Sequence, residues 1–340
     1  MNYSVNKYEN AKFITKTNYE NNALRNSSNC YGYTDAIIDN NFNLIYYSVY
    51  YSTYDYNKYN NDIKNMYFNK DCLNNKFFIN ENCLMITTWF RSYGHLMDSL
   101  TIIYDFYIKY RLYDSNYKII ISIPPNETNV LEVARILFGD NIINLFSYED
   151  IYSFIEFKHL LLISNHVEFS YFLSYPDSAA NKLIENFNDP NIISYENVFI
   201  SRPHNINPNS RLLKNLPELE VFFRNNNFKI IVPDMMNIKT LYNIIKNSKN
   251  IIITNGSALS NLFIMNKNTK IFCLNSESYL PEWRRKCKSE DEIDHSLWST
   301  DNFEKNIWRN TITRYNFTYI DSFENIITDN QCKYILDNII

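Results

Sequence analysis

The second half of the chain alternates short apolar runs with helical segments, and this alternation constrains the fold more than any other feature. The helical segments are about a dozen residues long, the length of the connections in βαβ units. The apolar runs are rich in β-branched residues and lie at 197–201, 228–232, 251–253 and 270–274. Strands separated by helices in this way form a parallel sheet covered by its crossover helices. We therefore predict an α/β fold for this half.

The first half is less regular, but it contains elements of the same kinds. Apolar residues recur at helical spacing over 94–113, which predicts an amphipathic helix. Other expected elements are a loose arm at 1–35, a hairpin within 36–53, strands at 84–88, 118–123 and 160–164, and a helix at 128–138.

The change to regular alternation near residue 190 predicts two domains. We place one α/β domain at 1–188 and a second at 189–320. A helical tail at 321–340 follows, which can cross back to the first domain.

Composition excludes several classes of protein. The 340 residues are 45% hydrophobic and 16% aromatic, which is enough to bury two cores. A net charge of −4 argues against binding nucleic acid through a basic surface. The six cysteines contain no CxxC pair, so we expect no zinc site. No apolar run approaches the ~18 residues of a membrane span. We expect a soluble, cytoplasmic protein without a signal peptide or transmembrane segment.

A candidate anion site follows the apolar run 251–253. Gly256 is one of four glycines in the chain, and glycine lets the backbone turn and approach a ligand closely. Ser257 can cap the next helix, whose first turn contains Ala258 and whose free N–H groups favour an anion. Asn255 precedes the turn. The alternative is that this is an ordinary connection from a strand to a helix, without a ligand.

Further polar residues are expected at the same edge of the sheet, where ligands of parallel α/β sheets bind. Arg202 and Arg211 can pair with phosphate, and Glu277 can accept from ribose hydroxyls. Together these residues suit a nucleoside diphosphate. The alternative makes the arginines surface cations and Glu277 a solvated loop acid.

His95 and Asp98 are the candidate catalytic residues of the first half. Their spacing places both near one face of the expected helix, and either can serve as a general base. The alternative is that both are structural.

Three blocks of the sequence resemble family-61 glycosyltransferases. GHLMDSL at 94–100 is similar to the family's GHWxxDSL-type motif. FISRP at 199–203, with Arg211, Asn215 and Glu218, resembles its "SR…R…NE-x-E" block. Residues 228–261 resemble the block that ends in HGAxLTN, with Asn255 where the family usually has His. The likeness covers roughly 84–275.

The resemblance implies a GT-B architecture, in which two Rossmann-like domains face a cleft. In this architecture, 1–188 is the acceptor-side domain and 189–320 is the nucleotide-sugar-binding domain. It implies inverting transfer of GlcNAc, xylose or a similar sugar from a UDP-linked donor to a glycan or protein acceptor. No cofactor or metal is required. Because no apolar run has the length of a membrane span, we expect the chain to lack the N-terminal membrane anchor that is usual in the family. This suits a large virus, with the protein in the host cytoplasm or virion, or an AT-rich microbe. The chain is compatible with a homo-oligomer.

On this interpretation the candidate residues fall into two groups. His95 and Asp98 are catalytic, and the donor-binding set is Arg202, Arg211, Asn255, Gly256, Ser257, Ala258 and Glu277. Two alternatives remain open. One is a sugar-nucleotide epimerase of the same architecture. The other, motivated by Asn255, is an inactive nucleotide-sugar-binding or scaffold protein.

Overall fold

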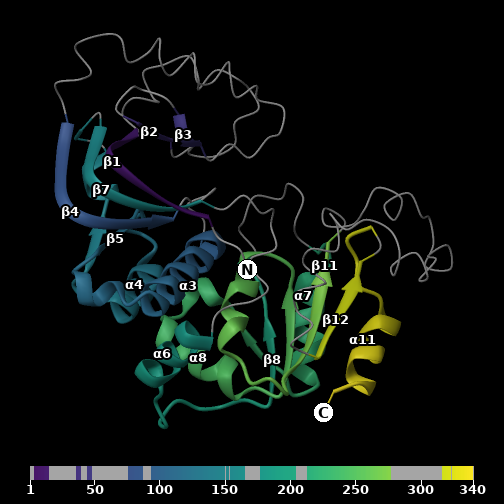
Figure 1. The fold of residues 1–340 in the computed structure, drawn as a ribbon. Helices are drawn as coiled ribbons and strands as arrows, with labels where there is room; N and C mark the ends of the chain where they lie inside the picture. Colours follow the sequence, from purple (N-terminus) through teal and green to yellow (C-terminus); the bar gives the residue numbers. More distant parts are fainter. Residues whose placement is uncertain are drawn as a thin grey trace. The chain divides into compact units, whose positions relative to one another are not determined.

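The computed structural model divides the chain into two compact α/β units, Met1–Glu168 and Phe169–Ile340. Each unit is built on one β-sheet flanked by helices (Figure 1). The residues that the structure describes are 4–14, 36–39, 44–47, 76–86, 93–149, 151–152, 154–164, 177–203, 213–276, 316–322 and 324–339.

The unit boundary precedes the predicted boundary at residue 188. Helix α6 (Asp177–Phe187) belongs to the second unit, since the ring of Phe187 meets that of Tyr242 edge-on at 5.5 Å. The change in sequence pattern near residue 190 places this helix in the first half.

The first unit contains a mixed sheet of seven strands in the order β3-β2-β1-β7-β4-β5-β6. Its strands are β1 (Ser4–Ile14), β2 (Ala36–Ile38), β3 (Leu44–Tyr47), β4 (Lys76–Ile86), β5 (Lys118–Ile121), β6 (Ile142–Asn144) and β7 (Phe154–Ser164). Its helices are α3 (Tyr93–Lys109), η3 (Leu112–Ser115), α4 (Thr128–Phe138) and α5 (Phe146–Glu149). Strands β7, β4, β5 and β6 are parallel, whereas β1 is antiparallel to β7.

The expected loose arm at the N-terminus is wrong for the residues that the structure describes. Strand β1 pairs along its length with β7 and inserts between β7 and β2. Ala11 and Phe13 are fully buried, while Lys12 between them is partly exposed. The polar residues of β1 hid this alternation, and pairing with the buried strand β7 decided the conformation. The predicted hairpin is confirmed as the antiparallel pair β2–β3.

The second unit contains a fully parallel sheet of five strands in the order β12-β11-β10-β8-β9. Its strands are β8 (Asn197–Ile200), β9 (Lys229–Ile231), β10 (Asn250–Thr254), β11 (Lys270–Asn275) and β12 (Asn316–Asp321). Besides α6, its helices are α7 (Leu216–Asn225), η5 (Pro233–Met235), α8 (Ile238–Asn247), η6 (Ser257–Ile264) and α11 (Asp329–Asp337). The predicted parallel sheet is confirmed.

Helices cover both faces of this sheet. On one face, Phe199 and Phe272 pack in a core with Phe223 of α7 and Ile335 of α11. The rings of Phe187, Tyr242 and Phe263 join α6, α8 and η6 in a second layer. The tail helix α11 therefore packs on the sheet of its own unit, because its apolar side completes that core. The strand β12 before it was not predicted.

Both sheets have strand orders found in doubly wound α/β folds. In chain order, β8 to β12 are arranged 2-1-3-4-5, and the parallel strands β4 to β7 are arranged 3-2-1-4. In such sheets the direction of winding reverses beside the first strand, and the crevice beyond the carboxyl ends there is where ligands bind. The two reversals lie between β8 and β10 and between β4 and β7.

Candidate functional site

The candidate site lies at the reversal of the second sheet, between the carboxyl ends of β8 and β10. Arg202 follows β8, and Asn255 and Gly256 follow β10. The two strands are parallel neighbours, which brings segments more than fifty residues apart in sequence into contact. The Arg202 side chain donates a hydrogen bond from Nη2 to the backbone oxygen of Asn255.

Gly256 is required where the Arg202 side chain crosses the turn. Its φ of 149° is a backbone conformation that side-chain-bearing residues rarely adopt. A Cβ at this position would overlap the guanidinium, lying 2.6 Å from Cζ. The predicted close approach at Gly256 is therefore made by an arginine of the same chain. The residue Arg202 is partly exposed, so a positively charged residue stands at the carboxyl end of β8.

The connection after Gly256 is a 3₁₀ helix, η6, and its start differs from the prediction. Gly256, not Ser257, occupies the N-cap position, and no side chain caps it. The backbone N–H of Leu259 bonds to the oxygen of Gly256 at 3.0 Å, which leaves the N–H groups of Ser257 and Ala258 ahead of the first internal turn. The backbone N–H groups at this end can still meet an anion.

A chain of side-chain hydrogen bonds runs along the carboxyl edge from β10 to β12. Asn255 Nδ2 donates to Asn275 Oδ1 at 2.7 Å, and Asn275 Nδ2 donates to Asp321 Oδ1 at 2.7 Å. Gln331 of α11 donates to the backbone oxygen of Asp321 at 2.8 Å. The oxygen Asn255 Oδ1 is buried and has no hydrogen-bond partner among the described residues.

A second polar pair supports the neighbouring strand end. Ser201, which is 1% exposed, donates to the carboxylate of Glu220 in α7 at 2.5 Å. Asn215 instead joins two segments, since its amide bonds to both the N–H and the oxygen of Ile327 at 3.2 and 2.8 Å. Glu218, by contrast, is exposed.

Sequence reasoning missed Glu220 and Asp321 as members of this edge. Glu220 lies two residues beyond Glu218, so its position in the same block was a usable signal. Asp321 ends a strand that was not recognised, and therefore gave no signal. Arg211 and Glu277 lie outside the described residues.

His95 and Asp98 lie on the first turns of α3, the helix that follows β4. Their backbone is described, but their side chains are not. The helix expected at 94–113 is observed as α3, which ends at Lys109. Leu96, Leu100 and Ile103 are buried as expected, but Thr101, Ile102 and Tyr104 on other sides of the helix are buried too, so α3 does not have the single apolar face of an amphipathic helix.

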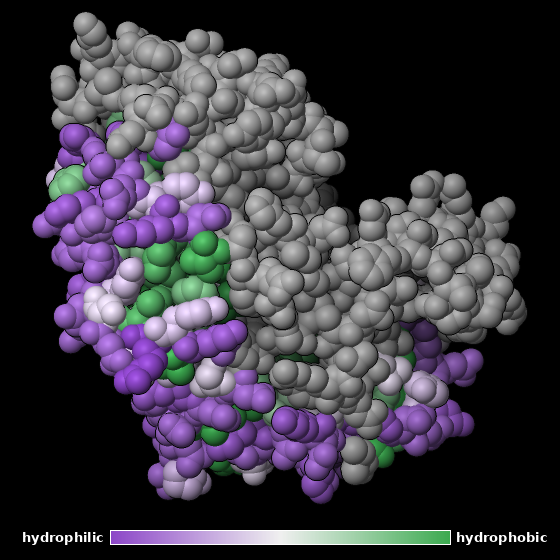
Figure 2. All heavy atoms as spheres, viewed as in Figure 1, coloured by the Kyte–Doolittle hydropathy of each residue, from purple (hydrophilic) through white to green (hydrophobic). Residues whose placement is uncertain are grey.

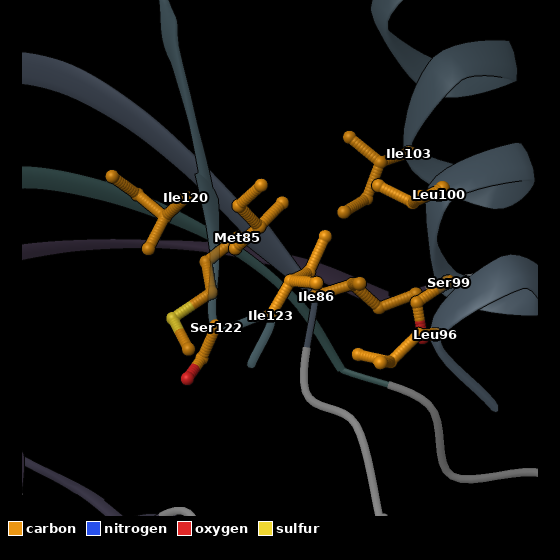
Figure 3. Close-up of a pocket in the computed structure, with 10 residues that line it drawn as sticks. Met85, Ile86, Leu96, Ser99, Leu100, Ile103, Ile120, Ser122 and Ile123 are labelled. Carbon is orange, nitrogen blue, oxygen red and sulfur yellow. The ribbon is translucent and has the colours of Figure 1, made fainter. Parts of the chain in front are cut away.

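An apolar pocket lies beside α3, at the carboxyl ends of β4 and β5 (Figure 3). Two hydroxyl side chains, Ser99 of α3 and Ser122 after β5, interrupt its lining, which otherwise consists of Met85, Ile86, Leu96, Leu100, Ile103, Ile120, Ile121 and Ile123. On the face drawn in Figure 2, most described residues are hydrophilic, and the main apolar area lies close to α3.

Two buried thiols, those of Cys83 and Cys332, are unsuited to nucleophilic catalysis. Burial and the nearby Glu81 raise the pKa of Cys83 to about 12. Burial and Asp329 raise the pKa of Cys332 to about 11. Both thiols are therefore protonated at neutral pH.

Among the described residues, no group of three or more His, Cys, Asp or Glu side chains is arranged to hold a metal ion. No helix in the described part is both long and apolar enough to cross a bilayer.

Comparison with protein families gives a match to the model described as Glycosyltransferase 61, over residues 48–272. The match includes the parallel strands β4 to β7 of the first unit, α3 with its GHLMDSL motif, and the second unit as far as the first residues of β11. Comparison with curated proteins gives no significant match.

Proposed function

Because the chain belongs to glycosyltransferase family 61, we propose that it transfers a sugar from a UDP-linked donor to a glycan or protein acceptor, with inversion at the anomeric carbon. The family implies a nucleotide-sugar donor. The two units, each with a doubly wound strand order, would form the two domains of a GT-B enzyme, with the donor bound by the second.

The observation that carries this proposal is the contact of Arg202 with Asn255 and Gly256 at the reversal of the second sheet. A guanidinium has five N–H donors, so the bond to Asn255 leaves others for phosphate oxygens. The N–H groups at the start of η6 lie on the same turn. A diphosphate bound there would meet positive charge as negative charge grows on the leaving group.

The remaining donor-side residues are proposed from their positions in the sequence. Arg211 and Ser257 would contact the diphosphate, with Ala258 contributing its backbone N–H. Glu277 would accept from ribose hydroxyls, two residues after the end of β11.

The acceptor side is proposed to be α3. This helix follows β4, which borders the reversal of the first sheet, so its first turns lie where ligands of such sheets bind. His95 or Asp98 would take the proton of the acceptor hydroxyl as it attacks the anomeric carbon.

Product analysis tests the proposal. The chain is incubated with UDP-sugars and a mixture of glycan and peptide acceptors, and the nucleotide and sugar products are identified. Release of UDP together with a glycosylated acceptor is expected. Conversion of the donor sugar alone would indicate an epimerase, and binding without any product would indicate a binding protein.

The arginines are tested in the same assay. Arg202→Ala and Arg211→Ala are each expected to weaken donor binding or turnover at least tenfold, equivalent to about 1.4 kcal/mol. Arg224→Ala is the control, because Arg224 is an exposed arginine of α7 in the same unit. Unchanged kinetics in both test variants would make Arg202 and Arg211 surface cations.

A further inference from the structure

The hydrogen-bonded chain from Asn255 to Asp321 has a direction, and Asp321 sets it. A carboxylate can only accept hydrogen bonds, so Asn275 must direct its Nδ2 toward Asp321. Asn275 then presents Oδ1 to Asn255, which must donate through its own Nδ2. The thiol of Cys273, 3.8 Å from Asn275 Oδ1, agrees with this orientation.

The consequence is a buried acceptor at the end of the chain. With Nδ2 of Asn255 directed at Asn275, the oxygen Oδ1 is directed away from it. Asn255 is 6% exposed, and its Oδ1 has no hydrogen-bond partner among the described residues. A buried acceptor without a partner is costly to keep. The acceptor Asn255 Oδ1 lies on the residue before Gly256, in the turn that the Arg202 guanidinium crosses.

We propose that Asn275 and Asp321 are positioning residues, which hold Asn255 Oδ1 ready to accept a hydrogen bond from a hydroxyl group of the nucleotide sugar. The proposal rests on the proposed function. It also divides the roles at the crevice. Arg202 attracts phosphate oxygens, whereas Asn255 Oδ1 repels them and accepts from a ribose or sugar hydroxyl.

The direction of the chain is tested without any ligand. Asn255→Asp places carboxylates on both sides of Asn275, whose single amide nitrogen can satisfy one of them, so this variant should lower the melting temperature. Adding Asp321→Asn allows the chain to run in reverse, with Asn275 donating to residue 255 and accepting from residue 321. The double variant should therefore be more stable than Asn255→Asp alone. If the double variant loses as much stability as the two single variants lose together, the direction assigned to these hydrogen bonds is wrong.

The role in binding is tested with paired ligands that differ by one hydroxyl. Wild type and Asn275→Leu are titrated with UDP, 2′-deoxy-UDP and 3′-deoxy-UDP, and with UDP-GlcNAc and its deoxy-sugar analogues. In wild type, removal of the hydroxyl that Asn255 engages should weaken binding about tenfold, which corresponds to the net contribution of one hydrogen bond. Compared with wild type, Asn275→Leu should bind the hydroxylated ligand more weakly by about the same factor. It should bind the deoxy analogue as tightly as wild type does. If the ligand pair with different affinities differs in the ribose, the hydroxyl comes from the ribose. If it differs in the transferred sugar, the hydroxyl comes from that sugar.

Asn197→Leu is the matched control. Asn197 accepts from Asn250 Nδ2 at 2.8 Å, so this change removes the same kind of bond between β8 and β10 at the opposite edge of the sheet. A loss of stability alone would appear in both variants, but the control should keep the preference for the hydroxylated ligand.

Two results would overturn the proposal, and they are distinguishable. If wild type binds nucleotides but Asn275→Leu keeps the full hydroxyl preference, the positioning role is wrong and the proposed function stands. If wild type binds none of UDP, GDP, CDP or their sugar conjugates, the proposed function and this inference fall together.

Discussion

At the scale of single residues, Arg202 and Gly256 act as a pair. The guanidinium occupies the space that a side chain at residue 256 would fill, so the identity of one residue depends on the other. Neither an arginine after a strand nor a glycine in a turn is specific by itself. Their contact across neighbouring strands is the observation on which the proposed anion site rests.

This dependence predicts a non-additive mutant cycle. Gly256→Ala should displace Arg202, because its Cβ overlaps the guanidinium, and should weaken donor binding about as much as Arg202→Ala, at least tenfold. The double variant should then be no worse than either single variant. Isothermal titration with UDP measures all three. Additive losses would mean that Gly256 contributes to binding independently of Arg202.

The proposed base gives a second prediction at this scale. Positioned bases typically contribute about 10²–10⁴-fold to rate. His95→Ala or Asp98→Asn should therefore lower kcat by that order in steady-state assays, while donor affinity stays unchanged. Asp105→Asn is the control, since Asp105 lies two turns further along α3. Turnover near that of wild type in both test variants would show that His95 and Asp98 are structural.

At the scale of elements, the ends of strands and helices build the site. Strand β12 brings Asp321 level with Asn275, its partner in the parallel register. Helix α11 secures that end: Thr328 and Gln331 form a capping box, and Gln331 also bonds to the backbone of Asp321. The tail of the chain thus supports the carboxyl edge through β12 and α11 together.

This arrangement predicts that α11 is essential to the second unit. Ile335 is fully buried in the core of that unit, so Ile335→Ala should lower the free energy of unfolding by about 2–5 kcal/mol. Tyr334→Ala on the same helix is the control, because Tyr334 is 49% exposed. Urea denaturation measures both. Equal, small effects would show that α11 does not pack as described.

At the scale of the whole molecule, two sheets of related strand order occur in one chain. The sequence patterns of the halves differ, because the first sheet adds the antiparallel strands β1, β2 and β3 to a parallel group. The family match spans both units, which supports a function that needs both.

The electrostatics of the proposed enzyme predict transfer that survives EDTA. Arg202, Arg211 and the start of η6 can supply the positive potential that a bound cation would supply to a diphosphate leaving group. Turnover in about 5 mM EDTA should match turnover without chelator. Added Mg²⁺ or Mn²⁺ should change turnover little. Strict dependence on either ion would contradict this prediction.

Much of the fold could be predicted from sequence where apolar spacing is strong. Helix α4 was expected at 128–138 and spans those residues, and the β8 to β11 alternation was recovered with ends shifted by one or two residues. The same patterns predicted that Arg202 and Gly256 share one edge, because strands of a parallel sheet end on the same side. Strands β1 and β12 were missed, and only the C-terminal parts of β4 and β7 were predicted, at 84–88 and 160–164. Polar residues weaken the apolar pattern in the parts that were missed.

The sequence by itself determined the α/β class, the family and the candidate residues, since these depend on local spacing and on motifs. The tertiary structure decided which residues meet. The bonds of Asn255 to Asn275 and of Asn275 to Asp321 join positions 20 and 46 residues apart. No local pattern encodes such pairs, because strand order determines them. The acceptor at Asn255 Oδ1 is a product of that order, since a carboxylate two strands away orients the amide.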